Sequence, residues 1–416
     1  MDKEFLADLY WAAVDAANPA TAITRHLPAP PSGKTLVVGV GKAAVPMLQA
    51  LQKAWSSPLR GIVVTTDAQD CSIPGVEVLV ASHPVPDIRG LRAARKIVRL
   101  LEGLSADDLV IALVSGGGSA LLPSPPPGLS LDDEIEVNRV LLASGAPISA
   151  MNTVRKHVST VKGGRLAALT AARVHTILVS DIPGDVASHV SSGPTIPDSS
   201  TREDALAVID SYQMTLPRQV MAHLRSEDAD APHPGDEAFQ GHTYGIVASA
   251  RVSLEAAADA AMSRSHSASV LSDAIEGEAR EVGVHHATLA KEARAGRQSS
   301  SMVLLSGGET TVSVKGSGRG GRNGEFLLAW ALAMDGVEGV TAIAADTDGI
   351  DGSEENAGAF ADGNTAARLR EMGLDGQTLL ANNDSYSAFA ALGDLFVTGA
   401  TGTNVNDFRA ILVEPI

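Results

Sequence analysis

Two short glycine-rich segments, at residues 115–120 and 306–310, each follow an apolar run of the chain. Glycine lets backbone N–H groups converge on an anion with no Cβ in the way, so such a segment after a strand is typical of a phosphate-binding loop. One loop of this kind is weak evidence, but two in one chain predict a polyphosphate site. The residues that we expect to bind a nucleotide in these loops are Gly116, Gly117, Gly118, Gly307, Gly308 and Glu309.

A third glycine-containing turn, at residues 39–44, fits the G-x-G-x-x-A form of the dinucleotide fingerprint, with Asp67 about twenty residues further on. Gly39 and Gly41 are therefore further candidates for nucleotide binding, although a tight strand-to-helix turn without a ligand also explains them. Lys42 opens the following helix, where its ammonium would lie beside a phosphate or carboxylate held at the helix N-terminus. The alternative for Lys42 is a solvated surface lysine.

Aspartates follow two of the predicted strands. Asp181 and Asp185 come directly after an apolar strand, at the sheet edge where open α/β proteins bind ligands. Either could hold Mg²⁺ or accept a proton from a hydroxyl, and a turn or helix cap is the alternative for Asp181. Asp346, Asp348 and Asp351 lie within six residues. This spacing lacks the bidentate glutamate of a calcium loop and predicts Mg²⁺ contact or plain turn chemistry.

Basic residues gather among glycines between positions 315 and 322, in an otherwise acidic chain. Arg319 and Arg322 suit a bidentate grip on phosphate or carboxylate, whereas a solvated charged face is the other interpretation. His83 lies in a proline-containing turn and could contact a substrate, although a hydrogen-bonded structural histidine also explains it.

Composition narrows the class of protein. The chain has 416 residues, which favours two domains, and 44% hydrophobic residues with 3% aromatic and 40 glycines suits alanine- and valine-rich α/β layers. A formal net charge of −17 disfavours nucleic-acid and anionic-membrane partners. No apolar run is long enough for a membrane helix, the N-terminus does not resemble a signal peptide, and Cys71 is the only cysteine. We therefore expect a cytoplasmic protein.

The first half of the sequence alternates apolar strands with helices after an amphipathic opening helix at residues 3–17, which predicts a parallel sheet with crossover helices. The strands are expected at residues 35–40, 61–66, 76–81, 109–115 and 174–180, and helices at 42–55, 90–101, 131–143 and 148–169.

A polar, proline-containing stretch at residues 227–236 is the best linker candidate. It divides the chain into an N-terminal domain, residues 1–235, and a C-terminal domain, residues 236–416. Further strands are expected at residues 243–248, 269–271, 301–305, 312–315, 340–344 and 395–398, with helices at 253–262 and 325–334.

Taken together, these motifs resemble the class II glycerate kinase family, which carries a C-terminal domain known as MOFRL. The resemblance covers nearly the whole chain. The matching segments are residues 39–43, 82–87, 115–120, 156, 162–167, 180–185, 192–195, 306–309, 320–325, 346–352 and 401–407. The family usually has glutamine where Gly324 stands, so no side-chain role of that position carries over to this chain.

The resemblance implies a Rossmann-like parallel α/β domain followed by a MOFRL-type α/β domain, with the active site in a cleft between them. It also implies ATP- and Mg²⁺-dependent phosphorylation of D-glycerate at the 2-hydroxyl. Lys42, Arg322 and Asp181 fall on the family's proposed catalytic or acidic positions. The residues that we expect to bind substrate are His83, Ser115, Ser119, Lys156 and Arg319, and those that we expect to hold the metal are Asp185, Asp346, Asp348 and Asp351.

Two other functions remain open at this point. Family members have been named hydroxypyruvate reductase, and the turn at residues 39–44 with Asp67 would serve NAD(P)H. A sugar-acid or nucleotide sensor without enzymatic activity is the second alternative. The reductase leaves the second glycine loop and Asp346 to Asp351 unexplained, and the sensor leaves the lysine, aspartate and arginine set without a role. The chain is expected to act as a monomer or homodimer.

Overall fold

The computed structural model describes residues 2–67, 71–296 and 300–415. The chain forms two compact units, one made of Pro19–Val247 and the other of Met1–Asn18 together with Ala248–Ile416. We call them the parallel-sheet unit and the mixed-sheet unit after their sheets. This division differs from the predicted boundary at residues 235 and 236, since the predicted linker stays inside the parallel-sheet unit and the N-terminal helix joins the mixed-sheet unit.

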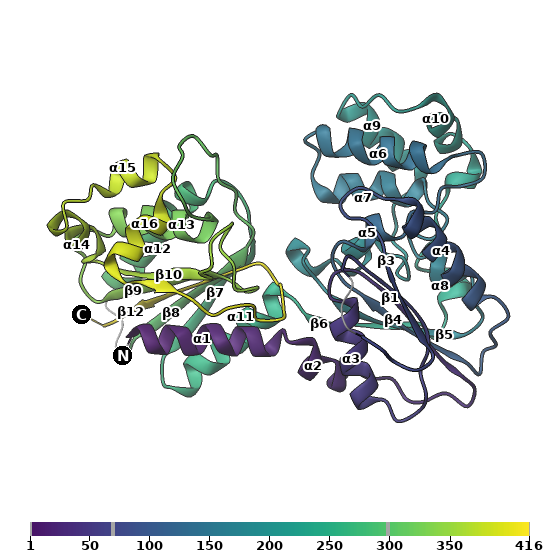
Figure 1. Cartoon of the computed structure of the whole chain (residues 1–416), viewed down its shortest axis with the longest axis horizontal. Helices are drawn as coiled ribbons and strands as arrows, with labels where there is room; N and C mark the ends of the chain where they lie inside the picture. The colour runs from purple at the N-terminus through teal and green to yellow at the C-terminus, as the bar shows by residue number, and fades with distance from the viewer. Residues whose placement is uncertain (1, 68–70, 297–299, 416) are drawn as a thin grey trace. The chain divides into compact units, whose positions relative to one another are not determined.

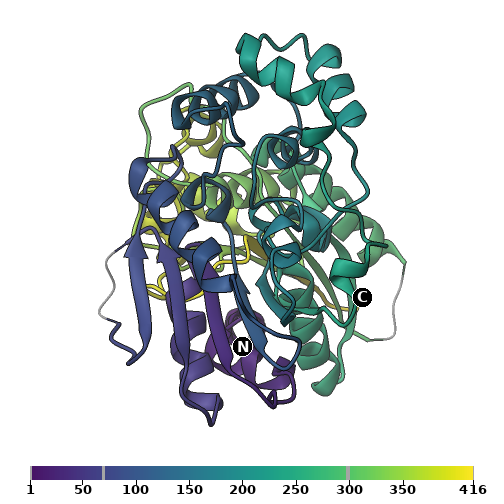
Figure 2. The same ribbon diagram turned by 90° about the vertical axis from the view of Figure 1, so that its right-hand side faces the viewer.

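The parallel-sheet unit contains six strands in the order β3-β2-β1-β4-β5-β6 (Figures 1 and 2). Strands β1 to β5 pair in parallel, as the alternating pattern of the sequence predicted. Because β1 lies between β2 and β4, its carboxyl end adjoins that of β4 in the middle of the sheet. The strands are β1 (Thr35–Val40), β2 (Arg60–Thr65), β3 (Val76–Val80), β4 (Leu109–Val114), β5 (Arg173–Val179) and β6 (Thr243–Ala248).

Helices cover this sheet and extend beyond it. The helical segments are α2 (Pro19–Ala22), η1 (Ile23–His26), α3 (Ala44–Ala54), α4 (Ile88–Leu101), α5 (Gly118–Leu121), α6 (Leu131–Ala143), α7 (Ile148–His157), α8 (Arg165–Ala168), η2 (Pro183–Asp185), η3 (Ala187–Ser192), α9 (Arg202–Ser211), α10 (Arg218–Leu224), η4 (Glu227–Ala229) and η5 (Glu237–Phe239). Residues 148–169 were predicted as one helix. The structure ends α7 at His157, where Val158 leaves the helical conformation with a φ of −121°. Gly163 and Gly164, with positive φ angles of 62° and 81°, then precede α8.

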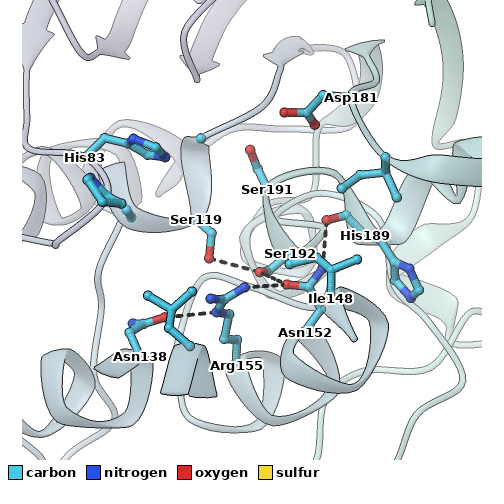
Figure 3. Close-up of a pocket in the computed structure, with 15 residues that line it drawn as sticks. His83, Ser119, Asn138, Ile148, Asn152, Arg155, Asp181, His189, Ser191 and Ser192 are labelled. Atoms are coloured by element: carbon cyan, nitrogen blue, oxygen red, sulfur yellow. Dashed lines mark hydrogen bonds between the residues drawn. The ribbon is translucent and has the colours of Figure 1, made fainter. Parts of the chain in front are cut away.

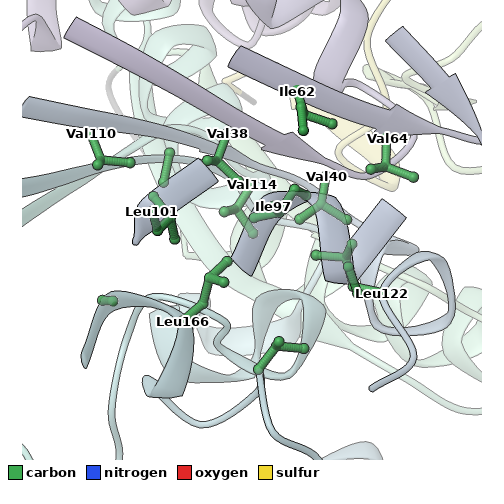
Figure 4. Close-up of a cluster of buried hydrophobic side chains, with 14 of the residues drawn as sticks. Val38, Val40, Ile62, Val64, Ile97, Leu101, Val110, Val114, Leu122 and Leu166 are labelled. Atoms are coloured by element: carbon green, nitrogen blue, oxygen red, sulfur yellow. The ribbon is translucent and has the colours of Figure 1, made fainter. Parts of the chain in front are cut away.

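The core of the parallel-sheet unit lies between α4 and the valine-rich strands (Figure 4). Val38 and Val40 point to the same face of β1 because side chains alternate along a strand, and they pack with Ile97 of α4. Burial of each such side chain contributes about 1.5–3 kcal/mol. A separate apolar cluster joins α6, α7, α9 and α10 into a helical layer beside the sheet, as Figure 1 shows.

The mixed-sheet unit has a six-stranded sheet in the order β11-β10-β9-β12-β8-β7. Strand β12 is antiparallel to both of its neighbours, β8 and β9, while β7 and β8 are parallel. The elements are α1 (Asp2–Ala16), α11 (Ala250–Ser263), β7 (Ser267–Ile275), α12 (Ala279–Ala295), β8 (Met302–Gly308), α13 (Arg322–Ala333), β9 (Val340–Asp346), β10 (Gly358–Asp362), α14 (Thr365–Glu371), α15 (Gly376–Ala381), α16 (Ser385–Leu392), β11 (Leu395–Phe396) and β12 (Asp407–Val413).

Both faces of this second sheet are covered. Helices α1 and α11 pack on one face, and α12 and α13 pack on the other. The amphipathic pattern of α1 was visible in the sequence, but the sheet that buries its apolar side belongs to the distant C-terminal half of the chain. The predicted α/β fold class, with a parallel-sheet domain and a second α/β domain, is confirmed.

Several elements of the mixed-sheet unit were not predicted or were predicted wrongly. Residues 312–315 are not a strand, and β12, the central strand, was not expected. A buried arginine, Arg409, interrupts the apolar run of β12, and its charge is compensated by Asp407 two residues earlier. Among the described residues no helix has the length and apolar character needed to cross a membrane.

One buried histidine makes the stability of this fold depend on pH. His286 of α12 is 2% exposed and lies 3.0 Å from the Ser306 hydroxyl through Nε2 and 2.9 Å from the Val282 carbonyl oxygen through Nδ1. Burial, with a smaller contribution from the Arg409 charge, lowers the pKa of His286 to about 4. The imidazole therefore stays neutral in the folded protein at pH 5 to 6, where an unfolded histidine is protonated.

We expect acid to destabilise the protein partly through His286. Because the folded pKa lies below the unfolded value of about 6.5, this contribution is complete above pH 6.5 and is lost as the pH falls toward 4, by about 3 kcal/mol in all. His286→Gln should reduce the loss of unfolding free energy between pH 7 and pH 4, measured by urea denaturation. His285→Gln, at an exposed position of the same helix, is the control. An unchanged pH dependence in His286→Gln would contradict the prediction.

Candidate active site

The carboxyl ends of β1, β4 and β5 meet beside a pocket of about 230 Å³ in the parallel-sheet unit (Figure 3). Segments that follow β3, β4 and β5 form one wall, and α6 and α7 of the helical layer form the other. Figure 3 shows His83 and Asp181 at one side of the pocket and Arg155, Asn138 and Asn152 at the opposite side. The pocket therefore combines polar groups from segments far apart in the sequence.

The turn after β1 is held tightly against the loop after β4. Gly41 has a φ of +123°, and a Cβ there would lie 2.2 Å from the Ser115 hydroxyl, so only glycine fits. The Lys42 N–H donates to the Gly116 carbonyl at 2.9 Å, and the Ala43 N–H donates to the Ser115 hydroxyl at 3.0 Å. The N–H of Gly41 also donates within the chain, to the Val64 carbonyl. These bonds occupy the amides that a pyrophosphate would need.

Three residues that we predicted to bind ligands are therefore packed against other parts of the chain. Gly39 lies inside β1, where a Cβ would come 2.7 Å from Val63. Gly41 and Ser115 join the two loops, and Ser115 is 1% exposed. The geometry does not support direct nucleotide contact by Gly39 and Gly41 or direct substrate contact by the Ser115 hydroxyl.

The Gly116–Gly118 loop brings together Lys42, His83 and Asp181. A Cβ at Gly116 would lie 1.8 Å from an Asp181 carboxylate oxygen. Gly117, with a φ of +83°, is flanked by the His83 ring and the Lys42 side chain, since a Cβ there would lie 3.2 Å from the ring and 3.3 Å from Lys42 Cγ. The absence of side chains in this loop is thus what allows the side chains of Lys42, His83 and Asp181 to approach one another.

The pKa values of this cluster reflect burial and mutual charge. Burial raises the pKa of Asp181, and the nearby Lys42 charge partly opposes this effect. Desolvation, together with the same lysine, lowers the pKa of His83. A carboxylate with a raised pKa is a better proton acceptor, and a neutral imidazole can accept or donate a hydrogen bond. This arrangement suits proton removal from a hydroxyl group.

The opposite wall of the pocket presents Arg155. This buried guanidinium donates from Nε to the Asn138 side chain at 2.9 Å and from Nη1 to the Asn152 side chain at 3.2 Å. Burial lowers the pKa of Arg155, but an arginine remains charged at pH 7. A fixed cation in a small pocket is a ready site for a carboxylate.

Two serines with left-handed backbone complete the pocket. Ser191 and Ser192 have φ angles of 53° and 60°, which non-glycine residues rarely adopt. The Ser191 hydroxyl donates to the Ser115 carbonyl at 2.6 Å, and the Ser192 hydroxyl lies 3.0 Å from that of Ser119. Ser119, a predicted substrate-binding residue, therefore does line the pocket.

Sequence reasoning missed several lining residues, namely Asn138, Ile148, Asn152, Arg155 and His189. The signal for Arg155 was its place in a basic stretch, but the sequence pointed to Lys156 instead. Lys156 is fully buried and pairs with Asp198, and burial lowers its pKa to about 8. It does not line the pocket, so its predicted direct contact with substrate lacks structural support.

The mixed-sheet unit holds the half-buried Arg322 in an ionic network with buried carboxylates. Its guanidinium pairs with Asp346, and its Nε donates to Asp407 at 2.6 Å. Burial alone would lower the pKa of Arg322, but the charges of Asp407 and Asp346 raise it above its ordinary value. Arg409 donates to the second Asp407 oxygen at 2.5 Å. Arg322, predicted to be catalytic, is therefore held by two carboxylates in this structure.

The acidic loop after β9 is mostly occupied by bonds within the protein. Both oxygens of Asp351 accept backbone N–H groups of Asn323 and Gly324, at 2.9 and 2.8 Å, so Asp351 caps the start of α13. Burial raises the pKa of Asp346 to about 8 and that of Asp351 to about 6. Asp348 accepts from the Ile350 N–H at 2.9 Å. Across residues 2–67, 71–296 and 300–415, no group of three or more histidine, cysteine or acidic side chains is arranged to hold a metal.

The remaining predicted residues have these positions. Gly307 and Gly308 lie within β8, paired with β12, and the Glu309 N–H donates to the Ile275 carbonyl at 2.9 Å. Arg319 is bound to Glu354 at 2.5 Å and lies over the Tyr386 ring at 4.2 Å. Asp185 borders a different pocket of the parallel-sheet unit.

Two protein families match the chain. Residues 5–225 match the domain of unknown function DUF4147, and residues 302–407 match the MOFRL family. The chain is 37% identical over 410 residues to the D-glycerate 2-kinase of Thermotoga maritima, covering 97% of both proteins. It is 47% identical over 417 residues to a protein of Agrobacterium vitis provisionally named hydroxypyruvate reductase, covering 99% of this chain and 94% of that one.

A solved structure agrees with these relationships. The crystal structure of a Thermotoga maritima glycerate kinase matches with a TM-score of 0.90 at 36% identity, covering 99% of each chain. The chain is accordingly a kinase enzyme with an α/β fold. It belongs to the MOFRL family of class II glycerate kinases.

The tight approach of Gly116 to Asp181 gives a sharp test of the site. Gly116→Ala would push the Asp181 carboxylate aside, because the new Cβ overlaps the end of a movable side chain rather than backbone. We expect ADP formation to fall at least tenfold with little change in the melting temperature. Gly235→Ala is the matched control, since nothing lies within 4 Å of the added methyl group. Unchanged kinetics in Gly116→Ala would show that the Asp181 position does not matter.

Proposed function

We propose that the protein transfers the γ-phosphoryl group of ATP to the 2-hydroxyl of D-glycerate, giving 2-phosphoglycerate and ADP. The observation that carries this proposal is that Arg155 and Asp181 line the same small pocket. The first suits a carboxylate and the second suits the proton of a hydroxyl, and glycerate carries these two groups on adjacent carbons.

The carboxylate of glycerate would bind Arg155. Asn138 and Asn152 fix the guanidinium, so little side-chain entropy is lost when the ligand binds. Leu142 and Ile148 also line the pocket and limit its size. A pocket of about 230 Å³ lies below the usual range for drug-sized ligands, which favours a three-carbon acid.

Asp181 would accept the proton of the 2-hydroxyl as its oxygen attacks the γ-phosphorus, and the bond to the ADP oxygen breaks. Lys42, beside Asp181 and next to the Gly116–Gly118 loop, would stabilise charge on the transferring phosphoryl group. Phosphoryl transfer needs positioning and charge neutralisation more than covalent chemistry. Asp181 and Lys42 are the kinds of residue that such a reaction requires.

Mg²⁺ is proposed as the companion of ATP, and it would supply charge neutralisation on the phosphates. The predicted ligands Asp346 and Asp351 do not fit a protein cage for this ion, because their oxygens already accept bonds from Arg322 and from backbone N–H groups. Mg²⁺ commonly keeps water and binds through substrate phosphates, so a dedicated cage is not required.

Hydroxypyruvate reduction is the second candidate function, favoured by the name of the 47% identical relative. It would require NAD(P)H at the fingerprint turn after β1. The amides of Gly41, Lys42 and Ala43 are bonded within the chain, which disfavours a pyrophosphate there. The kinase therefore remains the better-supported proposal.

A coupled assay tests the reaction and its regiochemistry. Protein, D-glycerate, ATP and Mg²⁺ with enolase, but without phosphoglycerate mutase, should form phosphoenolpyruvate, because enolase accepts only the 2-phosphate. A signal that appears only after mutase is added would mean transfer to the 3-hydroxyl. Oxidation of NAD(P)H by hydroxypyruvate, without ADP formation from glycerate, would support the reductase instead.

Replacement of Arg155 tests the carboxylate site. Arg155→Gln should raise the KM for D-glycerate by about 10- to 100-fold, because a charged hydrogen bond contributes about 1.5–3 kcal/mol. The KM for ATP should change little. Arg139→Gln is the control on α6, where the arginine is exposed and bonded to Glu136. An unchanged KM for glycerate in a folded Arg155→Gln protein would remove Arg155 from the site.

A further inference from the structure

A second pocket of about 650 Å³ lies in the parallel-sheet unit, between β5, β6 and the segment that contains η2 and η3. Its volume is within the usual range for small-molecule sites, whereas the pocket with Arg155 is too small for a nucleotide. All of its lining residues belong to one compact unit. The proposed reaction needs room for a nucleotide, and this pocket provides it.

The two pockets share one wall. Asp181, His189 and Ser191 line the smaller pocket, and the intervening Asp185 and Val186 line the larger one. The four-residue step from Asp181 to Asp185 spans at most about 14 Å of extended chain. An extended nucleoside triphosphate can bridge such a separation, so a nucleotide with its base in the larger pocket could direct its phosphates toward Asp181 and Lys42.

The lining of the larger pocket suits an uncharged ring and sugar rather than phosphates. The rings of Phe239 and His242 meet edge to face at 5.9 Å, and Tyr244 is 59% exposed beside them. Burial lowers the pKa of His242, so this ring is neutral at pH 7. Among the described residues that line this pocket there is no lysine or arginine, and Asp185 is the one carboxylate. A phosphate would be repelled there, whereas ribose hydroxyls could donate to Asp185.

Asp185 is also held in an uncommon conformation. Its φ of 53° lies in the left-handed region, directly after Gly184 at 75°. Such a conformation costs on the order of 1 kcal/mol or more for a non-glycine residue and persists only where the surroundings impose it. The fold therefore holds the backbone of Asp185 in this conformation at the pocket wall.

We propose that this second pocket binds the adenine and ribose of ATP, with Asp185 accepting hydrogen bonds from the ribose hydroxyls. The purine lies against the aromatic group of Phe239, His242 and Tyr244. This inference rests on the proposed glycerate kinase function, because that function supplies the nucleotide, and it assigns the nucleoside end of the donor to the parallel-sheet unit.

Two variants separate this pocket from the site of phosphoryl transfer. Asp185→Asn keeps the shape, and asparagine tolerates a positive φ, but it loses the charge. Val186→Trp fills the pocket from an exposed position of its wall. The controls are Asp210→Asn, on the exposed surface of α9, and Val314→Trp, at an exposed position of the mixed-sheet unit.

We expect the KM for ATP to rise about tenfold in Asp185→Asn and more in Val186→Trp, with the KM for glycerate unchanged. Saturation-transfer NMR with adenosine alone should show binding to the wild type and to both controls, and no binding to Val186→Trp. Kinase activity with an unaltered KM for ATP in both variants would overturn the pocket assignment and leave the proposed function intact. Absence of glycerate phosphorylation would refute the proposed function, while adenosine binding that Val186→Trp abolishes would still support the pocket. Absence of adenosine binding to the wild type would refute the pocket.

Discussion

The contact between the turn after β1 and the loop after β4 supports the whole site in the parallel-sheet unit. Gly41 approaches Ser115 so closely that no side chain fits between them, and two backbone N–H groups of the turn donate to Ser115 and Gly116. The Ser191 hydroxyl, in the segment after β5, also donates to the Ser115 carbonyl. Three segments that are distant in sequence are thereby fixed to one another, and the Gly116–Gly118 loop can hold Lys42 and Asp181 close together.

Arg155 gives this pocket a local positive charge in a protein that is acidic as a whole. The protein carries a net charge of −17, so an anionic acid is repelled by the molecule as a whole and must be attracted locally. Arg155 provides a positive charge that Asn138 and Asn152 hold in place without neutralising it. In contrast, Lys162 is neutralised by Glu134 at 2.7 Å in a buried pair. An arginine that donates only to neutral amides can still bind the carboxylate of a ligand. A lysine already paired with a carboxylate cannot.

The mixed-sheet unit uses its charges differently. Arg322, Arg409 and Asp407 form one buried network at the ends of β9 and β12, joined to Asp346. Removal of one partner from such a network leaves a buried charge without compensation and costs about 3–5 kcal/mol. The pairing with Asp407 explains why a buried arginine can lie near the start of β12.

The sequence by itself determined the parallel α/β sheet, the glycine loop after β4 and the places of Lys42 and Asp181, because strand periodicity and glycine turns are local signals. The second glycine-rich segment was predicted as a loop, but its Gly307 and Gly308 belong to β8. The sequence also carried the family's ordered motifs. Only the tertiary structure decided that α1 joins the C-terminal sheet and that Arg155, rather than Lys156, faces the pocket. Adjacent residues on a helix point about 100° apart, so the neighbouring strands and helices determine which one is buried and which meets the ligand. The aspartates after β9 also needed the tertiary structure. Aspartate serves both as a helix cap and as a metal ligand, and only the groups that contact the carboxylate distinguish the two roles.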